Sequence, residues 1–135
     1  MNTFLVIEDN EDDALLIKRA FSMTGSCQAV LRRNMGEAKA YLQRAGVYSD
    51  REKYPFPNAV ISDLHLGLDS AVDFLHWIRA SEELRSMGVV VLSGTASARE
   101  GALVKDLGGL DILKKPATYE DLKSMVQDMV SKLCG

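Results

Sequence analysis

Short apolar runs alternate along the chain with longer segments in which apolar residues recur every three or four positions. The runs occupy residues 4–7, 29–31, 59–62, 89–92 and 110–113. Runs of this length are typical of buried strands, and the segments between them have the length and periodicity of crossover helices. The pattern therefore predicts five strands alternating with helices.

The helical segments carry their own start signals. Four of them begin with a polar residue that is followed three positions later by an acid: Asn10 with Asp13, Asn34 with Glu37, Ser70 with Asp73, and Thr118 with Asp121. The last segment has the clearest apolar face, made of Leu122, Met125, Val126, Met129, Val130 and Leu133. Strands that alternate with helices favour a parallel sheet covered on both faces. We predict a flavodoxin-like, doubly wound (βα)5 α/β fold with strand order 2-1-3-4-5.

Composition narrows the class of protein. The 135 residues are 47% hydrophobic and 26% charged, which is typical of one globular domain with its own core. The apolar runs are far shorter than the ~20 residues that cross a bilayer, and residues 1–4 lack the features of a secretion signal. We therefore expect a cytoplasmic protein that does not bind a membrane.

Charge and cysteine content exclude further classes. The formal net charge is −3, and the basic residues are mixed with acids, which argues against a nucleic-acid partner. Cys27 and Cys134 form neither a metal knuckle nor a CxxC pair, so we interpret them as reduced thiols. Residues 46–58 hold two of the three prolines and predict a long surface connection, either a solvated insertion or a loop that contacts a partner.

Acidic residues directly follow two of the predicted strands. Glu8 and Asp9 come after the first strand, and Asp63 comes after the third. In a parallel sheet the carboxyl ends of neighbouring strands meet at one edge, where such sheets bind ligands. Carboxylates ~4 Å apart near a surface repel by roughly 1–4 kcal/mol per pair, so this cluster requires a cation. An open set of oxygen ligands favours Mg²⁺.

Two further polar residues end strands at the same edge. Ser93 follows the fourth strand and Lys115 the fifth. Such a site suits phosphoryl transfer, in which a protein mainly positions groups and neutralises charge. Asp63 is the candidate nucleophile, because a carboxylate can accept a phosphoryl group as an acyl phosphate. The neighbouring acids, Asp12, Asp13, Asp69 and Asp73, fit helix capping or solvated charge.

Four motifs stand in register along the chain: IEDN at 7–10, ISDL at 61–64, VLSG at 91–94 and KKP at 114–116. Together they resemble the landmarks of the receiver domains of two-component response regulators, and the resemblance covers nearly the whole chain. It implies a single receiver domain over residues 1–135, without an output domain, that a sensor histidine kinase phosphorylates on Asp63. Residues 8–17 and the loop at 46–58 look similar to small stand-alone receivers that serve bacterial phytochromes.

The resemblance also assigns roles to the metal ligands. Asp9, Asp63 and the main-chain carbonyl of His65 would bind Mg²⁺, and Glu8 would act through metal-bound water. The protein would not be an enzyme beyond catalysing its own phosphotransfer and dephosphorylation. Its signal would then pass through contacts with a downstream protein or with a second copy, as a monomer or a homodimer.

The same resemblance assigns the groups around the phosphoryl group. Ser93 would take a slot usually held by Thr or Ser, and Lys115 the slot of an invariant lysine. The Lys115–Pro116 peptide bond would be cis, a form that proline makes accessible at ~0.5–1 kcal/mol. The side chains of His65 and Thr95 would shape the access of water to the acyl phosphate.

The chain departs from the family pattern in two places. The loop after Asp63 has Gly67, Ser70 and Ala71 where members often have Pro, then Asp or Asn, then Gly. Ile112 stands where many receivers place a rotating Tyr or Phe. How phosphorylation would be transmitted is therefore an open question.

Two other functions compete with a receiver. A Mg²⁺-dependent small-molecule phosphatase or phosphotransferase of the haloacid-dehalogenase type would need an acid two residues after its nucleophile, and this chain has His65 there. A nucleotide-binding flavodoxin-like protein would need a Gly-rich loop after the first strand, where the chain instead has Glu8 and Asp9. Turnover of phosphate esters would favour the phosphatase, and a single labile phosphoryl adduct would favour the receiver.

Overall fold

The computed structural model describes residues 2–66, 69–94, 98–108 and 111–134. Its main sheet has five parallel strands: β1 (Asn2–Ile7), β2 (Cys27–Arg32), β3 (Ala59–Asp63), β6 (Gly88–Ser93) and β7 (Asp111–Lys114). They lie in the order β2-β1-β3-β6-β7, which is the predicted order 2-1-3-4-5 when only these strands are counted. The predicted start of the last strand, Leu110, lies outside the described residues.

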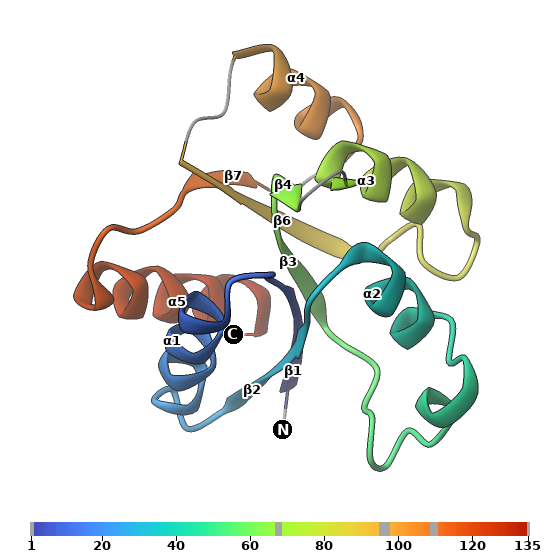
Figure 1. The fold of residues 1–135 in the computed structure, drawn as a ribbon, viewed down its shortest axis with the longest axis horizontal. Coiled ribbons are helices and arrows are strands. Elements are labelled where there is room, and N and C mark those ends of the chain that lie inside the picture. Colours follow the sequence, from blue (N-terminus) through green and yellow to red (C-terminus); the bar gives the residue numbers. More distant parts are fainter. Residues whose placement is uncertain (1, 67–68, 95–97, 109–110, 135) are drawn as a thin grey trace.

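Helices cover both faces of the sheet (Figure 1). Helices α1 (Glu11–Ser22) and α5 (Tyr119–Cys134) pack on one face, and α2 (Met35–Leu42), α3 (Ala71–Ala80) and α4 (Ala98–Asp106) pack on the other. Each face has its own hydrophobic cluster, so β1 and β3 are buried on both sides. Burial on both faces explains why their sequences are continuous apolar runs rather than alternating ones.

Strand β1 shows how one run serves both clusters. Phe4 and Val6 face α1 and α5, whereas Leu5 and Ile7 face the α2 side, as the two-residue period of a strand requires. All four side chains are at most 1% exposed. This central strand and its neighbour β3 therefore hold the acids at their ends in fixed positions.

Three of the four predicted helix caps bind the predicted residue. The side chains of Asn10, Asn34 and Thr118 accept hydrogen bonds from the backbone N–H groups of Asp13, Glu37 and Asp121 at 3.0, 2.8 and 3.1 Å. Ser70 also caps α3, but it accepts from Val72 N at 3.1 Å rather than from Asp73. A serine side chain is short enough to reach either of these first free N–H groups.

The long connection before β3 packs on itself and on α2. It begins with a 3₁₀ helix, η1 (Gly46–Ser49), and the rings of Tyr41, Tyr48 and Tyr54 pack on one another with centroids 5.0–6.2 Å apart. Arg51 stacks on Tyr41 and donates to the carbonyls of Tyr54 and Tyr41, each at 3.0 Å. The segment is a surface connection, as predicted, that is anchored by its own aromatic cluster.

A small antiparallel pair of strands, β4 (His65–Leu66) and β5 (Asp69–Ser70), follows β3 and leads into α3. The backbone N–H of Ala71 donates to the carbonyl of Leu64 at 2.9 Å, which ties the start of α3 to the end of β3. Among the described helices, none combines the length and the apolar character needed to cross a bilayer.

Candidate functional site

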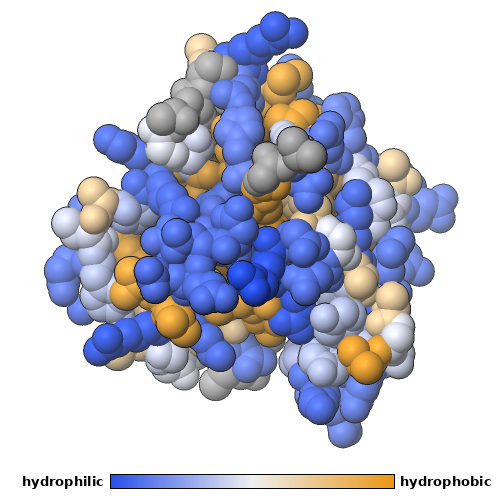
Figure 2. All heavy atoms as spheres, viewed as in Figure 1, coloured by the Kyte–Doolittle hydropathy of each residue, from blue (hydrophilic) through white to orange (hydrophobic). Residues whose placement is uncertain are grey.

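The three acids predicted at the strand ends come together. Asp63 is the last residue of β3, and Glu8 and Asp9 directly follow the neighbouring strand β1. One carboxylate oxygen from each lies within 4.8 Å of the other two. Glu8 and Asp63 are buried, whereas Asp9 is exposed. Figure 2 shows the molecule from the same direction as Figure 1. Mostly hydrophilic side chains surround the middle of this view, and apolar atoms appear in separate spots.

Lys115 directly follows the edge strand β7, and its side chain reaches this cluster past the end of β6. Its Nζ lies 3.0 Å from Glu8 Oε2, 3.3 Å from Asp63 Oδ2 and 3.0 Å from Asp13 Oδ2. Burial disfavours the ammonium, but the hydrogen bonds to Glu8 and Asp13 and the nearby negative charges outweigh this cost and raise the pKa of Lys115. The lysine is therefore a fixed positive charge beside Asp63.

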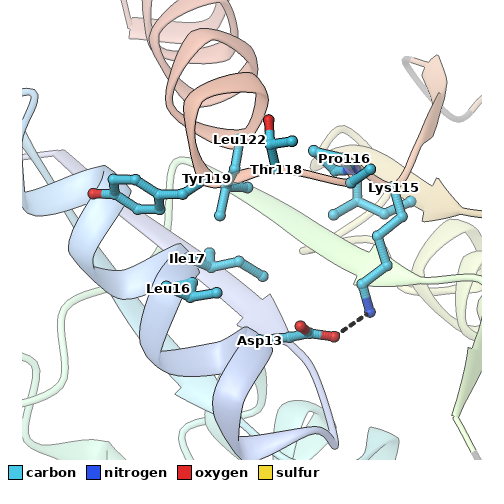
Figure 3. Close-up of a pocket in the computed structure, with 10 residues that line it drawn as sticks. Asp13, Leu16, Ile17, Lys115, Pro116, Thr118, Tyr119 and Leu122 are labelled. Atoms are coloured by element: carbon cyan, nitrogen blue, oxygen red, sulfur yellow. Dashed lines mark ion pairs between the residues drawn. The ribbon is translucent and has the colours of Figure 1, made fainter.

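Asp13 is the site residue that sequence reasoning missed. It was interpreted as a helix-capping acid, and its N–H does take part in the cap of α1. Its carboxylate, however, turns towards Lys115 (Figure 3). Asp13 stands four residues before the buried Ile17, and residues at this spacing share one face of a helix. That spacing was the available signal that Asp13 faces inwards.

Asp63 is electrostatically unusual. Burial, together with the hydrogen bond and charge of Glu8, raises the pKa of its carboxyl to about 8, because Lys115 lowers this pKa by less than the other causes raise it. Its Oδ2 contacts Lys115, whereas its Oδ1 is buried and has no hydrogen-bond partner among the described residues. A buried carboxylate oxygen without a donor is costly unless it binds a cation.

These features fit a divalent metal ion. The cluster offers oxygen ligands only, and it combines one exposed and two buried carboxylates with the unpaired Asp63 Oδ1. Hard cations such as Mg²⁺ and Mn²⁺ prefer carboxylate, carbonyl and water oxygens. The donor set therefore matches the predicted class of cofactor.

A cavity of about 190 Å³ opens beside Asp63. Its lining includes Asp63, His65, Ser93 and Lys115. The backbone N–H of Lys115 donates to the carbonyl of Ser93 at 3.0 Å, which fixes the end of β7 against the end of β6. The structure thus brings Ser93, Lys115 and Asp63 together around one space, as the sequence predicted.

His65 lies at the edge of this cavity rather than in the acid cluster. Its side chain is 61% exposed, and its Nε2 lies 2.9 Å from Glu100 Oε2 in α4. The imidazole therefore contacts a helix that is remote in sequence. The predicted metal bond from the main-chain carbonyl of His65 stays a prediction.

The Lys115–Pro116 peptide bond is trans, so the expected cis bond was wrong. The two forms of such a bond differ by only ~0.5–1 kcal/mol with trans favoured, and the sequence alone does not choose between them. Ile112 lies in β7, half-buried against the cluster on the α2 side. Gly67 and Thr95 lie outside the described residues, whereas Ser70 and Ala71 form the start of α3.

Comparisons with known proteins show the family of this chain. No protein-family model matches the chain. A probable methanogenesis regulatory protein of Methanothrix harundinacea, FilR2, is 31% identical over 125 residues, which are 93% of this chain and 79% of that protein. The response regulator Rcp1 of Synechocystis is 28% identical over 128 residues, covering 94% of this chain and 85% of Rcp1.

Solved structures with the same fold are also response regulators. The phosphorylated cyanobacterial phytochrome response regulator RcpA superposes with a TM-score of 0.87 at 26% identity, over 99% of this chain and 94% of RcpA. The Mn²⁺-bound form of Rcp1 has a TM-score of 0.82 at 26% identity, over 97% and 93% of the two chains. These relatives are signalling proteins and give no support to the small-molecule phosphatase. The chain belongs to the receiver domains of two-component response regulators.

Proposed function

We propose that Asp63 accepts a phosphoryl group from a sensor histidine kinase, with Mg²⁺ as cofactor, and that the protein signals through altered contacts with other proteins. The observation that carries this proposal is the position of the Asp63 carboxylate, which touches Lys115 and borders the cavity shared with Ser93. The single-domain organisation and the choice between monomer and homodimer stay predictions.

The transfer step uses few protein groups. An Asp63 carboxylate oxygen forms the new O–P bond as the N–P bond of the kinase phosphohistidine breaks. The bonding pair stays on the imidazole nitrogen. Lys115 neutralises charge on the phosphoryl oxygens, and the Ser93 hydroxyl donates a hydrogen bond to one of them. This division of labour suits phosphoryl transfer, where positioning and charge neutralisation provide most of the catalysis.

The acid cluster has a second task, which is to hold the metal. Glu8, Asp9 and Asp63 would hold Mg²⁺, with the main-chain carbonyl of His65 as a further ligand. When bound, Mg²⁺ supplies positive charge to the phosphoryl oxygens. A cation beside Asp63 would favour the charged form of its carboxyl, because opposite charges attract. The attacking carboxylate would then be available at neutral pH.

The proposal is tested by incubating the protein with acetyl phosphate and Mg²⁺ and measuring its intact mass. The wild type should gain one phosphoryl group, and Asp63→Asn should gain none. Asp69→Asn is the matched control, because Asp69 is an exposed acid in the nearby strand β5. Phosphorylation of the Asp63→Asn variant, or no labile adduct on the wild type, would overturn the proposal.

A kinase needs a surface from which its histidine can reach Asp63. Helix α1 offers one, because Leu15 and Leu16 are 64% and 39% exposed beside the acid cluster. A hollow of about 100 Å³ lies between Leu16, Asp13 and Tyr119 of α5 (Figure 3). Exposed apolar side chains next to a reactive group are typical of a docking site. We therefore propose that the kinase docks on α1.

The similarity to RcpA and Rcp1 supports a kinase of the phytochrome type. Leu16→Glu should slow phosphotransfer from such an autophosphorylated kinase at least tenfold and leave labelling by acetyl phosphate unchanged. Leu103→Glu is the matched control, because Leu103 is also 39% exposed but lies on α4. Equal rates for both variants would exclude α1 as the docking surface.

A further inference from the structure

Among the described α-helices, α4 buries the fewest side chains. Val104 is the only described side chain of α4 that is fully buried, whereas α3 buries Ala71, Phe74, Leu75 and Ile78. The position of α4 therefore depends more on polar contacts at its two ends than on packing. Elements held by few buried contacts are those that move most readily.

The carboxyl end of α4 is clamped by Arg79 of α3. Arg79 Nε donates to the carbonyl of Leu107 at 2.8 Å, and Nη2 donates to the carbonyl of Gly108 at 2.8 Å. Gly108 has a φ of +78°, and a Cβ there would lie 3.0 Å from Arg79 Nε. Two hydrogen bonds from Arg79 to backbone carbonyls therefore hold this end.

The amino end of α4 is held through the site itself. His65 Nε2 lies 2.9 Å from Glu100 Oε2 in the first turn of α4. His65 also lines the cavity beside Asp63 and stands two residues after it. His65 thus borders the space for the phosphoryl group, and its imidazole contacts the helix.

We propose that the His65–Glu100 contact is a latch that holds the amino end of α4 in the unphosphorylated protein and that phosphorylation of Asp63 releases. The latch rests on the proposed function of Asp63 and adds to it a route of transmission. A phosphoryl group brings a charge of about −1.5 to −2 and three strong acceptor oxygens at pH 7. The Nε2–H group of His65 has one hydrogen to donate, so the phosphoryl oxygens compete with Glu100 for it.

Electrostatic repulsion would also favour release of the His65–Glu100 contact. Glu100 carries a negative charge and would face a new negative charge across His65, so repulsion favours separation of the helix from the cavity. The Arg79 clamp keeps the other end in place. The predicted movement is therefore a swing of the first turn of α4 about its carboxyl end.

This route explains how the chain functions with Ile112 in β7. An isoleucine has neither a ring to rotate nor a hydroxyl to bond, so it cannot act as an aromatic switch. A Cβ on Gly101 of α4 would lie 3.9 Å from Ile112 Cγ2, so the helix and the strand approach closely at this point. The latch transmits the signal through a different pair of residues.

Amide hydrogen exchange of residues 98–106 tests the latch. In the Glu100→Ala variant, these amides should exchange roughly two- to fivefold faster than in the wild type before phosphorylation. This range is expected for loss of the partly exposed contact with His65. Phosphorylation by acetyl phosphate should produce a similar acceleration in the wild type and little further change in the variant. Alanine favours helix, so the variant should fold normally.

Asp106→Ala is the control, because it removes an exposed carboxylate from the other end of the same helix. It should leave the resting exchange rates unchanged and respond to phosphorylation as the wild type does. Intact mass is measured on the same samples. A missing phosphoryl adduct overturns the function proposed for Asp63. Resting exchange that is unaltered by Glu100→Ala, or a full response to phosphorylation in that variant, overturns the latch.

Discussion

The carboxyl ends of β1 and β3 place charged side chains in the interior, whereas helix α4 places them at the surface. At the strand ends, Lys115 contacts three carboxylates, and Glu8 and Asp63 are only 2% and 8% exposed. At α4, one contact joins the largely exposed His65 to Glu100. The buried network holds the geometry that the proposed phosphoryl transfer needs. The exposed contact is weak enough for the phosphoryl group to break it, as we propose for the latch.

The difference shows where such a protein can vary. Removing a member of a buried charge network leaves the others uncompensated, which costs several kcal/mol. Exposed contacts are worth less than about 1 kcal/mol each, so they can be replaced without loss of the fold. The buried site can accordingly be recognised from its residues, whereas the proposed transmission route uses an exposed pair that is free to vary.

Of the changes considered, removal of Lys115 should lower the free energy of unfolding most, because it breaks the buried charge network. Lys115→Ala leaves Glu8, Asp13 and Asp63 without their cation, and we expect the free energy of unfolding at pH 8 to fall by about 3–5 kcal/mol without metal. Lys114→Ala, at the exposed neighbouring position, should change it by less than about 0.5 kcal/mol. Urea unfolding measures both, and equal effects would mean that the contacts of Lys115 contribute no stability.

The pH dependence of stability should show the buried Asp63 directly. Its pKa is about 8 in the folded protein against 3.8 as the ordinary value, so between these values the folded state binds more protons than the unfolded state. Stability from this group is therefore present at low pH and is lost as the pH rises towards 8. We expect a loss of about 2–4 kcal/mol across this window.

Asp63→Asn should remove that loss, so the variant becomes increasingly more stable than the wild type as the pH rises from 4 to 8. Mg²⁺ should stabilise the wild type at pH 8 and have little effect on the variant. Thermal unfolding at several pH values, with and without Mg²⁺, measures both effects. Parallel pH profiles for the two proteins would show that Asp63 ionises normally in the folded state.

At α4 the expected effect is smaller and local. Val104→Ala removes the one fully buried side chain described in this helix and should cost about 1–3 kcal/mol. Amides of α4 should then exchange faster while those of β1 change less. Leu103→Ala, at a position 39% exposed, is the control. Uniform acceleration over the whole chain would show that α4 opens only with global unfolding.

The sequence predicted the sheet and the acid cluster because local patterns encode both. Apolar runs mark strands that are buried on two faces, and an acid directly after such a run must lie at the sheet edge. Caps are equally local, and Asn10, Asn34 and Thr118 bind where the spacing predicted. Asp63, Glu8 and Lys115 could therefore be brought together without coordinates.

The remaining features depend on tertiary contacts. The β4–β5 pair has two residues in each strand, too few to show a period. The His65–Glu100 contact joins residues that no spacing rule relates. The carboxylate of Asp13 has two possible tasks, and only the approach of Lys115 selects between them. The aromatic cluster around Tyr41 likewise depends on how the chain folds back after α2.

The smallest predicted effect separates burial from distance. Arg33 Nη2 lies 3.3 Å from Glu11 Oε1 beside Glu8 and Asp9, the same separation as between Lys115 Nζ and Asp63 Oδ2. The Arg33 and Glu11 side chains are 66% and 75% exposed, against 31% and 10% for Lys115 and Asp63. Water screens the exposed pair, so Glu11→Gln should cost only about 0–0.5 kcal/mol and should leave acetyl phosphate labelling unchanged. Urea unfolding at low and high salt checks this prediction. A cost comparable to that of Lys115→Ala would mean that separation, rather than burial, sets the strength of these ion pairs.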